Sequence, residues 1–178
     1  RRYHQLLWSK PLPNGEFFDL DSNSGNGYLH HKSELGEFVL TSDSVIQTFA
    51  SWKRFSHIKE ELSERDVENF HYIGYTIGGM IIFPGNRIDG RMTINGARGC
   101  DPKIADRFDL TLECIKRYYV GEVSPLHTVL YRYDNFFRLF NDFQSYVEFF
   151  LLQDWVIADY SATRFFTPFD NFNSPPLP

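Results

Sequence analysis

Three arginines stand among glycines and asparagines in residues 86–99, NRIDGRMTINGARG. The arginines are Arg87, Arg91 and Arg98, and Asn95 lies between the last two. A guanidinium group offers a planar fork of N–H donors that matches phosphate or carboxylate oxygens, and glycine lets the backbone come close to a ligand. We therefore expect these four residues to bind an anion, with a phosphate-bearing ligand (a nucleotide or single-stranded nucleic acid) as the leading candidate.

A second interpretation of the same loop stays open, in which it is a glycine-rich connection with arginines facing solvent. The spacing matches neither the P-loop nor the dinucleotide-binding fingerprint. Asp101 followed by Pro102 is typical of a helix start, and residues 101–119 are expected to form one amphipathic helix. An Asp101 carboxylate at that start would occupy N–H groups that an anion would need.

Acidic residues follow the arginine-rich loop. Asp106, Asp109 and Glu113 recur at i, i+3 and i+7, so one helix would place them on one face, close enough for a metal or an acid–base pair. Asp106 and Asp109 are the candidates for acid–base catalysis. Arg117 lies one turn after Glu113, and such interleaved charges favour a solvated face on which the acids contact water.

Other chemistry has less support from the sequence. The six histidines show no HExxH or comparable metal spacing, and His30 and His31 in a strand would point to opposite faces of the sheet. We predict no metal site, and no cofactor is indicated. Cys100 and Cys114 have no metal-like spacing, and no nucleophile-elbow or cysteine-protease signature is present. Whether the protein is an enzyme stays open.

The composition is that of a globular protein. A chain of 178 residues with 42% hydrophobic and 23% charged residues fits one domain with a hydrophobic core, and we expect a single domain over residues 1–178. The net charge of −5 disfavours a dedicated duplex-binding protein, which would carry a basic surface. The longest apolar run is far shorter than the roughly 20 residues that span a bilayer, and no signal-peptide pattern is visible. We expect a cytoplasmic protein with no membrane partner.

The order of predicted elements favours an α+β fold, with a small N-terminal antiparallel or mixed sheet and a helical C-terminal half. Strands are predicted at 28–33, 37–42 and 80–83, the first two joined as a hairpin through Leu35-Gly36. Residues 11–27 are predicted to form an irregular loop, and residues 170–178 a proline-rich tail.

Helices are predicted in five places, from cap residues and apolar periodicity. They are expected over 42–55, from Ser63 onwards, over 101–119, after Ser124-Pro125, and after Asn141 or Asp142. In the second of them, Val67, Phe70 and Ile73 would form the buried stripe. In the last, Leu151 is expected to face inward with the preceding aromatic residues.

Aromatic residues make up 17% of the chain, with 18 Phe, 10 Tyr and 3 Trp, so a phenylalanine-dominated core is expected. The run 135–152, NFFRLFNDFQSYVEFFLL, is more apolar than a surface helix pair requires. It is either the central buried part of the fold or a dimer face. The second reading supports a different class of function, a non-enzymatic interaction protein or homodimer that uses aromatic-rich helices 125–152.

Two long segments, GYTIGGMIIFPGNRIDGRMTINGARGCDPKIADRFDLTLECIKRYY and FRLFNDFQSYVEFFLLQDWV, resemble a family of small bacterial proteins of unknown function. The segments LLWSKPLPNGEFFDLD, YLHHKSELGEF and RFFTPFDNF look like the same family, so the resemblance covers nearly the whole chain. It implies a bacterial, cytoplasmic, single-domain protein. No catalytic residue is carried over, because no activity is established for that family.

Overall fold

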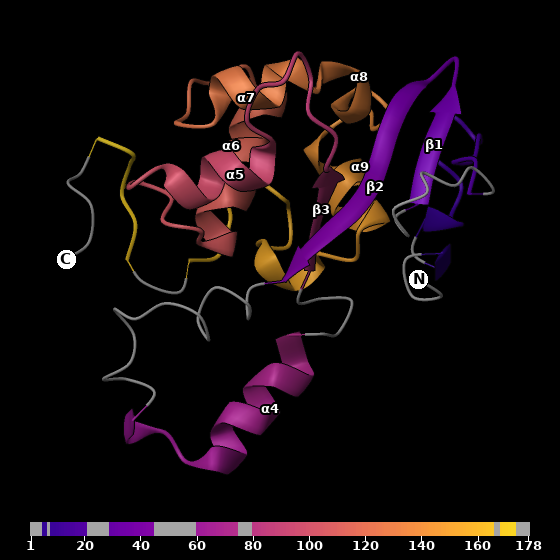
Figure 1. The fold of residues 1–178 in the computed structure, drawn as a ribbon. Helices are drawn as coiled ribbons and strands as arrows, with labels where there is room; N and C mark the ends of the chain where they lie inside the picture. The colour runs from indigo at the N-terminus through magenta and orange to yellow at the C-terminus, as the bar shows by residue number, and fades with distance from the viewer. Residues whose placement is uncertain are drawn as a thin grey trace.

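The computed structural model describes residues 5–6, 8–20, 29–44, 60–74, 80–165 and 168–173. A small antiparallel sheet lies beside a group of short helices from the C-terminal half of the chain (Figure 1). This arrangement confirms the predicted α+β class. None of the described residues belongs to a helix that is long and apolar enough to cross a membrane.

Three strands form the sheet in the order β1-β2-β3, with both pairs antiparallel. They are β1 (Leu29–Ser33), β2 (Gly36–Ser44) and β3 (Met80–Pro84). Phe38 and Leu40 of β2 are buried, while Glu37 of the same strand is exposed, so the two-residue alternation of a half-buried strand holds. The predicted hairpin and third strand are confirmed.

The β1–β2 turn depends on a glycine. Gly36 has φ +129°, a conformation that side-chain-bearing residues rarely adopt, and a Cβ there would lie 2.6 Å from the Phe38 ring. Residues 42–44, predicted as the start of a helix, belong to β2 instead. The rest of that predicted helix, including Trp52, lies outside the described residues.

Six α-helices and a short 3-10 helix lie wholly within the described residues. They are α4 (Glu64–Gly74), α5 (Ile94–Cys100), α6 (Phe108–Tyr119), α7 (His127–Arg132), α8 (Asp134–Phe137), α9 (Phe143–Phe149) and η3 (Gln153–Trp155). Two predicted starts are confirmed by their hydrogen bonds. The Ser63 hydroxyl accepts from the Asp66 N–H (3.2 Å), and the Asp142 carboxylate accepts from the Ser145 N–H (2.7 Å).

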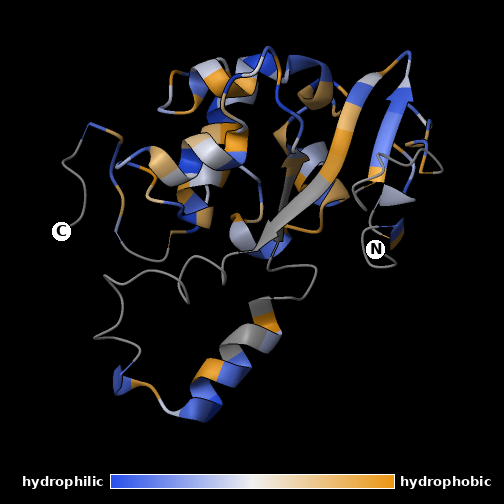
Figure 2. Ribbon diagram, viewed as in Figure 1, coloured by the Kyte–Doolittle hydropathy of each residue, from blue (hydrophilic) through white to orange (hydrophobic). Residues whose placement is uncertain are grey.

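Helix α4 departs from the prediction in its burial. Ile73, expected in a buried stripe with Val67 and Phe70, is 63% exposed, and Tyr72 beside it is 79% exposed. Figure 1 shows α4 away from the sheet and from α5–α9, and in Figure 2 its described residues are mostly hydrophilic. The predicted buried stripe is therefore wrong at Ile73.

The core is built from aromatic side chains, as predicted. Trp8 is fully buried, with ring centroids 4.9 Å from Phe18 and 5.4 Å from Phe150. Phe149 and Phe150 are 5% and 0% exposed, so the apolar run 135–152 lies largely within the fold. Leu151 is an error of the prediction, because it adopts φ +59° after the end of α9 and is 43% exposed.

Candidate functional site

The arginine-rich loop has more regular structure than the sequence suggested. Residues 94–100 form α5, and the Thr93 hydroxyl caps it by accepting from the Gly96 N–H (3.2 Å). The predicted helix over 101–119 is wrong in its first third, because α6 begins only at Phe108. The Asp101 N–H already bonds to the Ala97 carbonyl (3.0 Å), so Asp101 closes α5 and does not open the next helix.

The interruption between α5 and α6 has a backbone signature. Ala105 and Asp106 have φ of 48° and 62°, in the left-handed region that a right-handed helix cannot include. The Asp106 N–H bonds to the Arg98 carbonyl (3.0 Å), which folds the connection back against α5. This return brings Asp106 next to the Arg98 side chain.

Arg98 is buried, with 1% of its surface exposed, and its donors are used inside the fold. Nε donates to the Thr111 hydroxyl (2.9 Å) and Nη2 to the Asp106 carbonyl (2.5 Å). Nη1 forms an ion pair with the Asp106 carboxylate and lies 3.3 Å from Oδ1 of Asn95. Arg98 therefore joins α5 to α6 and does not reach the surface where a ligand would bind.

The acidic residues do not form the predicted solvated face. Asp109 is fully buried and bidentate with Arg107, at 3.0 Å from Nε and 2.6 Å from Nη2. Glu113 is 4% exposed. The expectation that these acids face water is wrong, because arginines pack over them and replace the water. An acid–base role for Asp106 or Asp109 stays a prediction, with each carboxylate held by a guanidinium group.

Glu113 is the centre of a second ionic cluster, whose burial the sequence did not indicate. Its carboxylate lies 3.0 Å from Arg117 Nε and 3.1 Å from Lys116 Nζ, and it accepts from the Thr163 hydroxyl (3.0 Å). The Arg117 guanidinium also lies over the Phe172 ring, 4.9 Å from its centroid. The spacing of Glu113 and Arg117 indicates their ion pair from the sequence, but the contact with Thr163 is tertiary and has no local signal. This cluster attaches the C-terminal segment to α6.

The neighbouring thiol is not a candidate nucleophile. Cys114 is fully buried, and burial raises its pKa to about 12, so the thiolate is scarce at neutral pH. Among the described residues, no group of three or more His, Cys, Asp or Glu side chains could hold a metal ion.

The first half of the loop, residues 85–93, is attached to two elements. The Gly85 N–H bonds to the Val39 carbonyl of β2 (2.9 Å), and the Tyr133 hydroxyl donates to the Asn86 carbonyl (2.7 Å). Arg132 of α7 donates through Nη2 to the Met92 carbonyl (2.5 Å). These bonds fix the backbone on either side of Arg87 and Arg91.

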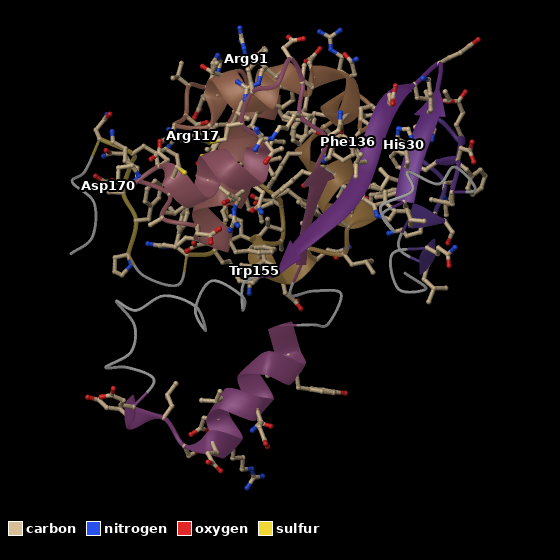
Figure 3. All side chains as sticks on the ribbon, in the orientation of Figure 1. His30, Arg91, Arg117, Phe136, Trp155 and Asp170 are labelled. Carbon is tan, nitrogen blue, oxygen red and sulfur yellow. The ribbon has the colours of Figure 1, made fainter. Side chains whose placement is uncertain are left out.

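Arg87, Arg91 and Asn95 are exposed, in contrast to Arg98. Figure 3 shows Arg91 at the outer edge of the molecule beside α7, far from the core residue Phe136. Arg132 brings a third cation to this surface, and its Nε is buried without a hydrogen-bond partner. We call Arg87, Arg91, Asn95 and Arg132 the loop surface.

The charge of the loop surface is not neutralised by ion pairs within the described part of the chain. Four other arginines there each contact a carboxylate; they are Arg98, Arg107, Arg117 and Arg138. No such pair involves Arg87, Arg91 or Arg132 among residues whose placement is described. Asp89, exposed in the same loop, supplies one negative charge nearby.

Fold and surface together define a small α+β protein with a cationic loop held against its sheet and helices. Residues 1–178 match the family of unknown function DUF6994, and the chain belongs to this family. No curated protein and no solved structure matches the chain.

Proposed function

We propose that the protein binds a phosphate-bearing ligand, a nucleotide or single-stranded nucleic acid, at the loop surface. Arg87 and Arg91 would contact phosphate oxygens, with Asn95 and Arg132 beside them. Arg98, which the sequence placed in the same set, acts in this proposal from inside the fold by holding α5 in place. A bacterial origin and a cytoplasmic location, implied by the family resemblance, are part of the same proposal.

One observation carries the proposal: Arg87 and Arg91 are exposed and have no carboxylate partner among the described residues, whereas Arg98, Arg107 and Arg117 each pair with an acid. Exposed arginines on a flexible segment would be weak support for a binding site. Here hydrogen bonds join the backbone around Arg87 and Arg91 to β2 and α7, so the two side chains extend from an ordered backbone. A preorganised cationic base lowers the entropy cost of binding an anion.

The alternative function, assembly through aromatic-rich helices 125–152, has lost its main support. That support was the apolar run 135–152, and burial of Phe149 and Phe150 in the core of this chain accounts for it. Assembly through these helices remains a separate proposal. Catalysis by Asp106 or Asp109 remains a separate proposal that ligand binding does not require.

Thermal unfolding in the presence of inorganic tripolyphosphate, adenosine triphosphate and a short oligonucleotide tests the proposal. A ligand at one hundred times its Kd adds about 2.7 kcal/mol of stability. For a protein of this size that corresponds to a rise in Tm of roughly 5–11 °C. We expect such a rise for at least one of these phosphate compounds, and we expect added salt to reduce it.

Arg87→Gln and Arg91→Gln are the informative variants, because both residues are exposed and their loss leaves the packing intact. We expect each to weaken binding about tenfold or more. Arg65→Gln on α4 is the matched control, an exposed arginine outside the loop surface. If the Arg91 variant responds to ligand like the parent and like the control, the loop surface is not the binding site.

A further inference from the structure

His31 of β1 holds the N-terminal segment against the sheet. Its side chain is 1% exposed. Nδ1 accepts a hydrogen bond from the Asp19 backbone N–H (2.7 Å), and Nε2 lies 2.8 Å from the Ser33 hydroxyl oxygen. The imidazole lies parallel to the Phe38 ring (interplanar angle 9°) and edge-on to Phe18 (88°).

The first of these hydrogen bonds fixes the protonation state of His31. A backbone N–H can only donate, so Nδ1 must be an unprotonated acceptor. The ring is therefore neutral, with its proton on Nε2, which donates to Ser33. The Ser33 oxygen also accepts from the Leu35 N–H (3.0 Å). A proton added at Nδ1 would place two hydrogens between Nδ1 and the Asp19 nitrogen and break the bond.

The segment held by this bond, residues 8–20, covers aromatic core. Trp8, Leu12 and Phe18 are all at most 4% exposed. Trp8 and Phe18 pack on Phe149 of α9 at centroid distances of 6.5 Å and 6.3 Å. At the other end of the segment, Lys10 donates to the Phe149 carbonyl. We call residues 8–20 the N-terminal arm.

The charged groups around His31 shift its pKa in opposite directions. Asp19 on the arm favours the protonated imidazole, and His30 on the same strand disfavours it. Lys32 of β1 and Glu37 of β2 pair with each other (3.3 Å), and Glu37 also contacts His30 (2.9 Å). Burial outweighs these effects and lowers the pKa of His31 below its ordinary value.

We propose that His31 is an acid-sensitive latch, in which protonation of Nδ1 breaks its bond to Asp19 and releases the N-terminal arm from β1. Release exposes the faces of Trp8 and Phe18 and the part of the core that they cover. The latch uses the hydrogen bond between arm and strand, and it is independent of ligand binding at the loop surface.

The sign of the pH dependence follows from linkage. Release frees the imidazole to regain its ordinary pKa of about 6.5, so the released state binds protons more readily than the closed state. The closed arm is therefore fully favoured above about pH 6.5. Below that pH the opening equilibrium constant rises about tenfold per pH unit, until the pH reaches the lowered pKa of the closed state.

Hydrogen exchange of the Asp19 amide, expressed as a protection factor at each pH, measures the opening directly. We expect the protection factor in the parent to fall about tenfold for each pH unit below about 6.5. His31→Gln should remove this dependence, because its amide can accept from Asp19 and donate to Ser33 but does not titrate. His30→Gln is the matched control, a histidine on the opposite face of the same strand, and should behave like the parent.

A measurement on the parent protein keeps the proposal testable even if His31→Gln fails to fold. Nitrogen NMR of the imidazoles should show His31 at neutral pH as the neutral tautomer with hydrogen on Nε2. The fall in Asp19 protection should begin near pH 6.5 and level off at the pH at which His31 titrates. A charged His31 at pH 7 would overturn the proposal. So would Asp19 protection that does not change between pH 7 and the pH at which His31 titrates.

Discussion

Replacing Arg98 with methionine tests the internal support of the loop. Methionine keeps most of the aliphatic volume and removes every donor. Bonds to Thr111, to Asn95 and to both the carboxylate and the carbonyl of Asp106 are lost together. Methionine has no donor to replace these bonds, and because Arg98 is 1% exposed, water has little access to the site.

The loss of stability in Arg98→Met depends mainly on the Asp106 carboxylate, which loses its ion pair with Arg98. Removing one partner of a buried ion pair costs about 3–5 kcal/mol, chiefly because the remaining charge has no partner. The Asp106 side chain is 14% exposed, so water can reach it in part. We therefore expect the lower end, a loss of about 3 kcal/mol in the free energy of unfolding. This corresponds to a fall in Tm of roughly 6–12 °C.

Urea unfolding of four proteins measures this loss and assigns it: the parent, Arg98→Met, Asp106→Asn and the double variant. Asparagine removes the stranded charge, so the double variant should lose less than the two single losses combined, with a coupling energy of about 0.5–3 kcal/mol. Arg91→Met is the control for loss of an exposed arginine and should change stability by less than about 0.5 kcal/mol. The reasoning fails if Arg98→Met and Arg91→Met are equally stable.

Two further predictions concern the thiols and the hairpin turn. In the folded protein Cys100 is exposed and Cys114 is buried, so we expect a thiol reagent to modify only Cys100. Cys100→Ser should abolish the reaction, and modification of both cysteines without unfolding would contradict the burial of Cys114. Gly36→Ala should lower the free energy of unfolding by roughly 1–3 kcal/mol, because alanine disfavours φ +129° and its Cβ meets Phe38. Gly99→Ala within α5 has open space around its Cβ and should leave stability unchanged or raise it. Equal stability of the two alanine variants would refute the turn argument.

The parts of the fold that follow from local rules were predictable from the sequence. Ser63 and Asp142 cap their helices through side-chain bonds to residues three positions later, a pattern visible in the sequence alone. The alternation of Phe38 and Leu40 in β2 follows from the two-residue period of a strand. Each of these features involves neighbours within a few residues, so one sequence contains the whole signal.

The candidate site was only partly predictable, because its decisive contacts join residues far apart or break a local rule. Asp101-Pro102 carries the composition of a helix start, yet the Asp101 N–H already serves the end of α5. Thr93, three residues before Gly96, was the signal for α5 that could have been used. The pairing of Arg98 with Asp106 depends on two left-handed residues in between, and no helical spacing predicts that turn.

The arginines that the structure describes differ in whether an acid pairs with them. This difference narrows the range of ligands that fit the loop surface. Within the described part of the chain, internal acids neutralise Arg98, Arg107 and Arg117, whereas Arg87, Arg91 and Arg132 of the loop surface have no such pair. The whole chain carries a net charge of −5, which repels an extended polyanion. Charges farther away than about 8 Å are largely screened at physiological salt, so a small ligand at the loop surface experiences mainly the charges of the loop surface itself. A compact phosphate compound therefore fits this surface better than a long single strand, which the net negative charge of the chain disfavours.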